Sequence, residues 1–356
     1  MEQKYTAIWQ KQNSHEREWI EEIFGPYITR HVLDGKHELA MDNAIVFDAF
    51  VYCQDPAYYA CFRGKNAYLF HFLDENYEGR YELYDNFRGV FRSFGSSVFN
   101  RRYVMTVPLG YSVGTRPTGT MERASQRKYV WSFVGQLGKA SRPDMAKALS
   151  RVEPHFLFAT DNTRGITIQP VQRAFTPSEY YEFLTQSTFS PCPMGNVNLE
   201  CYRVYEALEC GSIPIVERRL SLDYFRDLLG IHPLPTVSSW AEAQRMIRQM
   251  LERPDELDAL QGRCTEWWSA FKLKYSAGIG TFLADHSLHN GGQRVEAMVS
   301  RRQKIPMWRV LELVRHHNLS ALCRRVERQA ERLVKQGKFR VAHRPGVPIA
   351  KTSGPR

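Results

Sequence analysis

The chain has 356 residues, of which 43% are hydrophobic and 13% aromatic. This length suggests two domains, each with a core of ordinary size. The sequence contains no run of about 20 apolar residues, so we expect no membrane-spanning helix. Because the N-terminus is charged and has no apolar signal segment, we expect a cytoplasmic protein.

The formal net charge is +10, but the basic residues are concentrated at one end. Residues 301–356 hold 15 Lys or Arg and 3 Asp or Glu, so the remainder is nearly neutral. Within this part, Met307–Val334 has apolar residues at helical spacing among arginines. We therefore predict a basic helical extension over residues 286–356. It is expected to pack on the first domain, with an anionic glycan, another protein or an anionic membrane surface as alternative partners.

The same extension carries neither interleaved aromatic residues nor a known reading motif, so we expect no nucleic-acid partner. The seven cysteines are odd in number, scattered, and form no C-x-x-C pair. Zinc and a disulfide framework are therefore poor interpretations, and reduced thiols are expected.

The first domain is predicted to cover residues 1–118 and to be α/β. Residues 7–33 show helical spacing of Ile, Trp and Phe. Compact runs rich in β-formers then predict strands of a buried parallel sheet. These runs are Ala44–Val51, Ala67–Leu73, Gly89–Phe94 and Val104–Leu109. The polar segment Ser112–Arg127 is predicted to be the linker.

The second domain, residues 119–285, repeats the alternation of strands and helices. Strands are predicted at Tyr129–Gly135, His155–Ala159, Thr188–Cys192 and Ile213–Val216. Helices are predicted at Arg142–Leu149, Ser178–Gln186, Leu199–Cys210, Trp240–Met250 and Asp255–Phe271. Two Rossmann-like, doubly wound domains facing a cleft are therefore expected, with ligands at the carboxyl ends of the strands.

One segment, Ser190–Val216, combines a turn with a helix start and reads SPCPMGNVNLECYRVYEALECGSIPIV. After the turn at Pro193, Gly195 and Asn196, a helix is predicted to begin near Asn198, which can cap it. Free amides at a helix start suit a diphosphate. Arg203 can add charge there, and Glu206, three residues on, can accept hydrogen bonds from ribose hydroxyls. The alternative is that Arg203 and Glu206 form an ordinary surface ion pair.

This segment resembles the donor-site signature of exostosin-like glycosyltransferases, and more tightly the ribitol xylosyltransferase branch. The shared pattern is CP-x-GN, then R-x-YEAL-x-x-GSIP. WSFVGQLGKASRPDM and VPLGY resemble it more loosely, so about residues 40–275 are covered. The resemblance implies a GT-B fold, inversion at the anomeric carbon and a uridine-diphosphate sugar donor. It also implies that Arg203 and Glu206 contact the donor, and that the sugar is xylose or another pentose.

Further donor-binding residues are expected at the strand ends of the second domain. Gly135 lets a diphosphate approach the backbone. Lys139 and Arg142 can reach the β-phosphate, and Arg142 matches the arginine that follows this strand in the resembling family. Thr160 and Asp161 are expected to border the uracil. The alternative for the two cations is a solvated basic turn.

In the first domain, Asp74 and Glu75 directly follow a predicted strand. An inverting transfer needs a base for the acceptor hydroxyl, and either residue is a candidate. The alternative is an acidic helix start; Asp48 and Asp55 are weaker candidates, and His71 is predicted to be a core residue. Arg88 and Arg92 are candidates for binding an anionic acceptor, or for pairing with Asp85.

No D-x-D sequence occurs, so we expect the leaving diphosphate to be neutralised by helix amides and arginines, with no metal cofactor. The sequence thus predicts an inverting glycosyltransferase that moves a sugar from a UDP-sugar to a glycan or polyol-phosphate acceptor. The alternative is a non-catalytic nucleotide-sugar or carbohydrate-binding module with the same fold.

Overall fold

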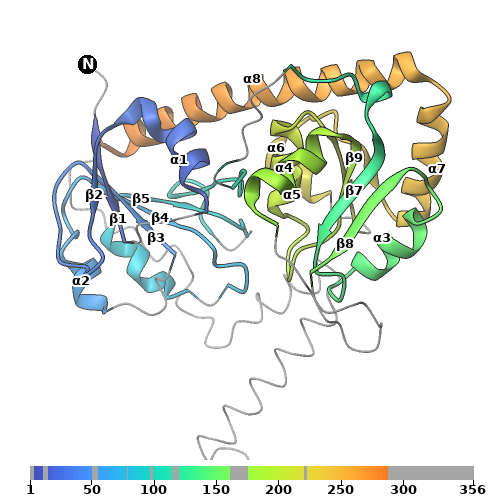
Figure 1. Ribbon diagram of the computed structural model, residues 1–356. Coiled ribbons are helices and arrows are strands. Elements are labelled where there is room, and N and C mark those ends of the chain that lie inside the picture. The colour runs from blue at the N-terminus through green and yellow to red at the C-terminus, as the bar shows by residue number, and fades with distance from the viewer. Residues whose placement is uncertain are drawn as a thin grey trace, which may run out of the picture.

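The computed structural model describes residues 4–10, 15–49, 55–77, 79–96, 99–112, 114, 120–160, 175–219 and 223–287. Two β-sheets, each made of parallel strands, lie side by side, and one long helix runs across both (Figure 1). The expected α/β class with two Rossmann-like domains, the GT-B arrangement, is confirmed. The basic extension predicted from residue 286 lies, apart from the last residues of this helix, outside the described residues.

The first sheet has six strands in the order β2-β1-β3-β4-β5-β6, and all neighbouring pairs are parallel. Every residue of β3, β4 and β5 is buried, as expected for central strands covered on both faces. The strands are β1 (Tyr5–Trp9), β2 (Ile28–Leu33), β3 (Ala44–Asp48), β4 (Ala67–His71), β5 (Gly89–Arg92) and β6 (Val104–Thr106). Helices α1 (Arg17–Phe24) and α2 (Pro56–Ala60) and the 3₁₀ segments Gly25–Tyr27 and Tyr81–Asn86 accompany them.

The prediction of a helix over residues 7–33 is wrong. Among the described residues of this range, α1 and the 3₁₀ segment Gly25–Tyr27 are helical, and they lie between β1 and β2. The apolar residues of β1 are buried in the sheet, whereas Trp19, Ile20, Ile23 and Phe24 form the buried face of α1. Helical spacing within α1 was thus extended to Ile8 and Trp9, which belong to a strand. The Gly25-Pro26 pair separates α1 from β2.

The second sheet has five strands in the order β11-β10-β9-β7-β8, again with parallel neighbours. Its predicted strands are confirmed within one residue. The strands are β7 (Tyr129–Gly135), β8 (His155–Ala159), β9 (Ser187–Cys192), β10 (Ile213–Glu217) and β11 (Thr236–Val237). The helices are α3 (Arg142–Leu149), α4 (Pro177–Thr185), α5 (Tyr202–Glu209), α6 (Tyr224–Leu229) and α7 (Trp240–Leu251), with a 3₁₀ turn at Ala124–Gln126. Thr176 caps α4 in a capping box with Glu179.

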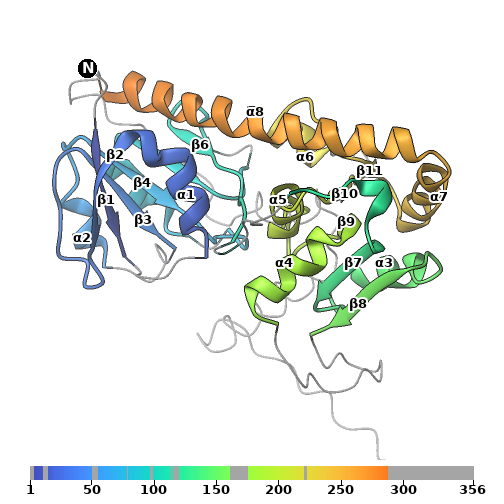
Figure 2. The same cartoon turned by 45° about the horizontal axis from the view of Figure 1, so that its top comes forward.

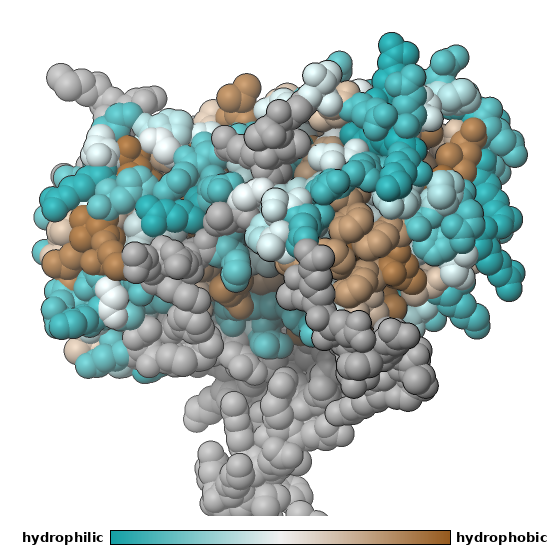
Figure 3. All heavy atoms as spheres, viewed as in Figure 1, coloured by the Kyte–Doolittle hydropathy of each residue, from teal (hydrophilic) through white to brown (hydrophobic). Residues whose placement is uncertain are grey.

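Strand β8 forms one edge of this sheet, and all five of its residues are partly exposed. Phe183 of α4 stacks on Phe156 with a centroid distance of 3.9 Å, and Phe175 packs edge-on against Phe158 at 4.7 Å. Figure 3 shows apolar side chains gathered on this side of the second domain. The edge strand is thereby partly covered by aromatic rings.

Helix α8 (Pro254–Ser287) has 34 residues and continues well past the predicted end at Phe271. It leaves the second domain and packs along the first sheet (Figures 1 and 2). The hydroxyl of Tyr68 donates to the carbonyl oxygen of Leu283 at 2.9 Å, and Phe282 lies 4.9 Å from the ring of Phe91. Among the described residues, no helix is both long and apolar enough to cross a bilayer.

The two domains share an aromatic cluster beneath α8. Trp19 of α1 stacks on Trp268 of α8 at 5.5 Å, and Tyr205 of α5 lies 5.7 Å from the same Trp268 ring. Nε1 of Trp19 also donates to the carbonyl oxygen of Pro108 at 3.0 Å. These contacts fix both sheets relative to α8, while the expected boundaries at residues 118 and 285 stay predictions. The described cysteines Cys61, Cys192, Cys201, Cys210 and Cys264 form no disulfide bonds with one another.

Candidate functional site

Arg203 lies in the first turn of α5, beside the carboxyl end of β7. Its Nη2 donates to the carbonyl oxygen of Val134 at 2.9 Å, and its Cζ lies 4.7 Å from the centre of the Phe133 ring. Its Nε is buried and has no hydrogen-bond partner among the described residues. A guanidinium with one unsatisfied N–H at the start of a helix can bind an anionic ligand by donating a hydrogen bond to it.

Gly135 ends β7 directly against this guanidinium. Its φ is +154°, and a Cβ added at this position would overlap Nη2 of Arg203. The backbone amide of Thr160 donates to the carbonyl oxygen of Gly135 at 3.1 Å, so Thr160 lies at the same edge. The structure thus brings three predicted donor residues together, namely Gly135, Thr160 and Arg203. Asp161 lies outside the described residues.

Glu206 lies one turn deeper on α5 and is only 6% exposed. Its carboxylate accepts hydrogen bonds from Oγ of Ser112 at 2.6 Å and from the hydroxyl of Tyr180 at 3.0 Å. Burial raises the pKa of Glu206, while these two hydrogen bonds and the charge of Arg203 oppose the rise. An ionised carboxylate has about four acceptor positions, so two remain for a ligand.

Two expectations about this helix are wrong. Arg203 and Glu206 are not a surface ion pair, because Glu206 is buried and no salt bridge joins the two described side chains. Helix α5 begins at Tyr202 rather than near Asn198, and its N-cap residue Cys201 makes no side-chain capping bond. The first amides of α5 are therefore not capped by a side chain. Asn198 itself is fully buried and bonds to the first domain instead.

The loop between β9 and α5 meets the loop after β4, so strand ends of the two sheets come together. Glu75 accepts from the backbone amide of Val197 at 2.7 Å and from that of Asn198 at 3.1 Å. Asn196 adds a hydrogen bond from its side chain to Glu75 at 2.9 Å. Gly195 leaves room for this carboxylate, because a Cβ there would lie 2.9 Å from Oε1 of Glu75 and 3.0 Å from the carbonyl oxygen of Glu200. The predicted donor residue Asn196 thus binds a carboxylate of the first domain, and Gly195 lies beside that carboxylate.

Arg142 follows β7 and bonds to the turn at the end of that strand; it is only 6% exposed. Its Nη1 donates to the carbonyl oxygen of Gln136 at 2.9 Å, and its Nε donates to that of Met194 at 3.3 Å. Lys139 lies half-buried in the same turn, and its carbonyl oxygen accepts from the amide of Arg142. Pro193 is buried at the end of β9. Arg142 therefore links the two loops that surround the start of α5, and the solvated-turn alternative does not describe it.

Polar residues also end the strands of the first sheet. Asp48 of β3, His71 of β4 and Arg92 of β5 occupy one register row, which continues to Thr106 of β6. We call this row, with the loop after β4, the first-sheet edge. The ends of β7, β9 and β10, with the start of α5, form the second-sheet edge.

Arg92 is fully buried at the first-sheet edge. Its Cζ lies 4.2 Å from the Phe99 ring and 5.3 Å from the Tyr81 ring. Its Nη2 lies 3.4 Å from Oδ2 of Asp74, which also accepts from the hydroxyl of Tyr81 at 2.5 Å. Burial works to lower the pKa of Arg92, but the neighbouring tyrosines and Asp74 hold it above its usual range. Asp74 and Arg92 are thus one buried ion pair.

Arg88 is placed apart from Arg92. It precedes β5, and its Nε donates to the carbonyl oxygen of Lys65 at 3.3 Å. Arg92 ends the same strand. The structure therefore does not bring the two arginines to one site.

His71 is buried, as predicted, and its Nδ1 lies 2.6 Å from the hydroxyl of Tyr84. Its Nε2 has no partner among the described residues, and burial lowers the pKa of His71 to about 4. His71 is thus a neutral core residue at neutral pH. Asp48 accepts from the hydroxyl of Tyr59 at 2.6 Å, and Asp55 caps α2 through the amide of Ala57.

Sequence reasoning missed the hydroxyls that hold Glu206. Ser112 belongs to the predicted linker, and Tyr180 belongs to α4, far from Glu206 in the chain. The YY pair at Tyr180–Tyr181 in an amphipathic helix was the available signal, but it indicated only packing.

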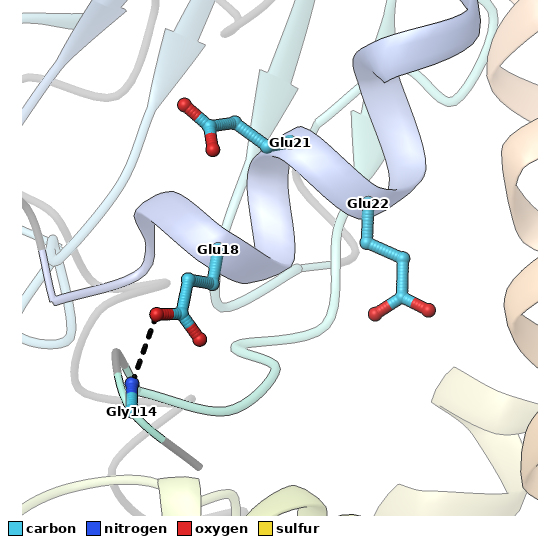
Figure 4. A pocket seen from close by; sticks show the side chains of 4 residues that line it. All are labelled: Glu18, Glu21, Glu22 and Gly114. Carbon is cyan, nitrogen blue, oxygen red and sulfur yellow. Dashed lines mark hydrogen bonds between the residues drawn. The ribbon is translucent and has the colours of Figure 1, made fainter. Parts of the chain in front are cut away.

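A cavity of about 540 Å³ lies beside α1 and is lined by Glu18, Glu21, Glu22 and Gly114. Figure 4 shows the three carboxylates and the hydrogen bond from the amide of Gly114 to Glu18, which measures 3.0 Å. Because the charged residues among its described lining are all acidic, this part of the cavity is unsuited to a diphosphate. The second-sheet edge remains the better candidate.

Comparison with known proteins gives a match over the second half of the chain. Residues 114–285 match the family model described as the RXYLT1 C-terminal domain. Ribitol-5-phosphate xylosyltransferase 1 of Danio rerio is 31% identical over 199 residues, which cover 51% of this chain and 45% of the relative. The protein of that name from Mus musculus is 37% identical over 177 residues, covering 48% and 37%. The chain thus spans less than half the length of these relatives.

Among solved structures, an α1,3-fucosyltransferase matches with a TM-score of 0.46 and 12% identity over 79% of this chain and 90% of that chain. The sequence matches support the resemblance to the ribitol xylosyltransferases over the second half of the chain. The wider exostosin-like resemblance stays a prediction.

Proposed function

We propose that this protein is an inverting glycosyltransferase that moves a sugar from a UDP-sugar to a hydroxyl group of a glycan or polyol-phosphate acceptor. The donor binds at the second-sheet edge, and the acceptor binds at the first-sheet edge. The observation that carries the proposal is the buried Nε of Arg203, which lacks an acceptor beside Gly135 and the start of α5. A buried donor without a partner is costly, and a phosphate oxygen would satisfy it.

Glu206 supplies the same site with a carboxylate that can accept hydrogen bonds from the ribose hydroxyls of the nucleoside. Its carboxylate lies on the same helix as Arg203, one turn further from the N-terminus, and is already oriented by Ser112 and Tyr180. Ribose hydroxyls can use its remaining acceptor positions or replace one of these two partners. A diphosphate at Arg203 and a ribose at Glu206 would then place the transferred sugar toward the first domain.

We propose Asp74 as the base of this transfer. The acceptor oxygen attacks the anomeric carbon while the bond from that carbon to the diphosphate oxygen breaks. The proton of the acceptor hydroxyl passes to Asp74, and UDP leaves with its charge balanced by Arg203 and the amides of α5. Asp74 is positioned by Arg92 and Tyr81. Arg92 therefore supports the acceptor side through Asp74.

The choice of a pentose such as xylose is supported by the similarity to proteins named ribitol-5-phosphate xylosyltransferase 1. Since Arg203 and α5 can carry the charge of the leaving group, we expect transfer to continue in the presence of EDTA. Peripheral contact of the basic extension with an anionic membrane belongs to the same proposal.

A thermal-shift screen against UDP-sugars tests the donor site. The wild type should be stabilised by UDP and by at least one UDP-sugar, which it should also turn over. Arg203→Ala should lose the UDP response, a fall in affinity of at least 100-fold, because a charged hydrogen-bonding group facing the diphosphate is removed. The melting temperature without ligand should change by only a few degrees.

Arg245→Ala is the matched control, because Arg245 is exposed on α7 of the same domain. It should keep the full UDP response. An unchanged UDP response in Arg203→Ala would refute the proposed site. A protein that binds UDP-sugars but transfers none of them would instead be the non-catalytic binding module.

A further inference from the structure

Glu75 connects the two domains at the point where their loops meet. Its Oε1 accepts from the amides of both Val197 and Asn198, and its Oε2 accepts from the side-chain amide of Asn196. Both carboxylate oxygens of this first-domain residue are therefore used by the loop that precedes α5. An acceptor from another domain thus satisfies amides that the loop does not satisfy itself.

The contact is reciprocal. The side-chain amide of Asn198 donates to the carbonyl oxygen of Glu75 at 3.3 Å, and the hydroxyl of Tyr77 donates to Oδ1 of Asn198 at 3.2 Å. Asn198 and Tyr77 are both fully buried. The side chain of Asn198 is thus held from both ends by residues 75–77 of the other domain.

The loop that carries Glu75 has an unusual backbone. Leu73 and Tyr77, on either side of Asp74 and Glu75, have φ values of +66° and +53°. Non-glycine residues adopt this left-handed conformation at an energetic cost, and such residues are often found at functional sites. Here the conformation directs Asp74 to Arg92 and the next residue, Glu75, to the second domain.

We propose that Glu75 is a positioning residue, which holds the loop before α5 in the shape that binds the donor and sets Asp74 relative to that donor. This inference rests on the proposed function for its effect on catalysis. In it, Glu75 takes no proton from the acceptor. Its carboxylate instead accepts hydrogen bonds from backbone amides of the loop before α5. Because these amides are already used, the diphosphate binds at Arg203 and the start of α5.

Three substitutions separate positioning from base catalysis. Glu75→Gln keeps a carbonyl oxygen that can accept from Val197 and Asn198, and the exposed Asn196 side chain can rotate its amide to suit. We expect kcat and the KM for the donor to stay within about threefold of the wild type. Glu75→Ala should raise the donor KM at least tenfold, because the loop amides lose their acceptor. Glu75→Asp, which is one methylene shorter, should fall between them.

The control is Glu82→Ala, because Glu82 is an exposed carboxylate of the same domain whose ion pair among the described residues is with Arg80. It should leave both constants unchanged. If Glu75 were the base, Glu75→Gln would lose roughly 100-fold or more in kcat. That result would overturn the inference, as would a donor KM for Glu75→Ala equal to that of the wild type.

Hydrogen–deuterium exchange of the peptide covering residues 193–201, without nucleotide, tests the contact independently of activity. Protection should be equal in the wild type and Glu75→Gln, and exchange should be at least tenfold faster in Glu75→Ala. Unchanged protection in Glu75→Ala would overturn the inference while leaving the proposed function intact. A wild type that binds no UDP-sugar would end the proposed function, yet this exchange experiment would still test whether Glu75 holds the loop.

Discussion

The two sheet edges differ in how their charged groups are satisfied. At the first-sheet edge, Arg92 is enclosed by aromatic rings and paired with Asp74, which also accepts from Tyr81. At the second-sheet edge, Arg203 keeps a buried N–H without an acceptor. A buried unsatisfied donor costs about 1–3 kcal/mol, so it is retained where a ligand supplies the missing partner. At the first edge the ion pair and hydrogen bonds therefore hold Asp74 in one position, whereas at the second edge Arg203 keeps a donor that a ligand can use.

Burial acts on titratable groups at both edges. It lowers the pKa of His71 to about 4, so that side chain stays neutral in the first sheet. It raises the pKa of Glu206, because burial disfavours the ionised carboxylate. The hydrogen bonds from Ser112 and Tyr180 and the charge of Arg203 favour the ionised form and reduce this rise. The comparison predicts that substitutions at the first edge reduce stability, whereas those at the second edge mainly reduce ligand binding.

The largest effect on stability is expected for Asp74→Asn. The substitution leaves the fully buried charge of Arg92 without its counter-ion, which typically costs 3–5 kcal/mol in the free energy of unfolding. Urea denaturation measures this loss. Glu82→Gln, at the exposed ion pair with Arg80, is the control and should cost less than about 1 kcal/mol.

Adding Arg92→Met to Asp74→Asn should recover part of the lost stability, since the unpaired charge is then gone. Equal stabilities of Asp74→Asn and Glu82→Gln would contradict the view that the ion pair of Asp74 and Arg92 stabilises the first edge.

Local sequence patterns predicted much of this architecture. Strands β7 and β8 and helix α3 were predicted with the bounds observed, because compact apolar runs and helical spacing are local signals. Arg203, Gly135 and Thr160 were predicted to lie near one another because carboxyl ends of parallel strands share an edge. Their closeness in the structure follows from that rule.

The rest depends on contacts between distant segments. The partners of Glu75 lie more than 120 positions away in sequence, so no local pattern could show that its oxygens bind Val197 and Asn198. Helix α8 was predicted to end at Phe271, although Ile279 and Leu283 continue its apolar face onto the first sheet. β1 was mistaken for helix because Ile8 and Trp9 also fit helical spacing.

Gly135→Ala tests how closely the second edge is fitted around Arg203. The added Cβ would overlap Nη2 of Arg203 and displace the guanidinium, and a φ of +154° disfavours alanine. We expect a loss of about 1–2 kcal/mol in stability together with a loss of the UDP response nearly as large as in Arg203→Ala.

Gly230→Ala is the matched control, because Gly230 also has a positive φ, +75°, but faces open space. It should be destabilised similarly and yet respond fully to UDP. If Gly135→Ala bound UDP like the wild type, Arg203 would not need its present position. In the Arg203→Ala background, Gly135→Ala should weaken UDP binding no further.

The smallest effect on stability, and the one of opposite sign, is expected for Glu206→Gln. Because the folded-state pKa of Glu206 is raised, the folded protein binds this proton more tightly than the unfolded chain. Stability is therefore lost as the pH rises from the ordinary carboxyl pKa, about 4.3, through the raised value. Glutamine removes this dependence, so at pH 7 the variant should be as stable as the wild type, or more stable by about 1 kcal/mol.

UDP affinity of Glu206→Gln should nevertheless fall about tenfold, because a charged acceptor for the ribose is lost. Urea denaturation between pH 4 and 8 and UDP titration measure the two effects, with the exposed Glu182→Gln as control. A loss of more than about 2 kcal/mol at pH 7 would place Glu206 with the structural charges of the first edge, and the distinction between the two edges would fail.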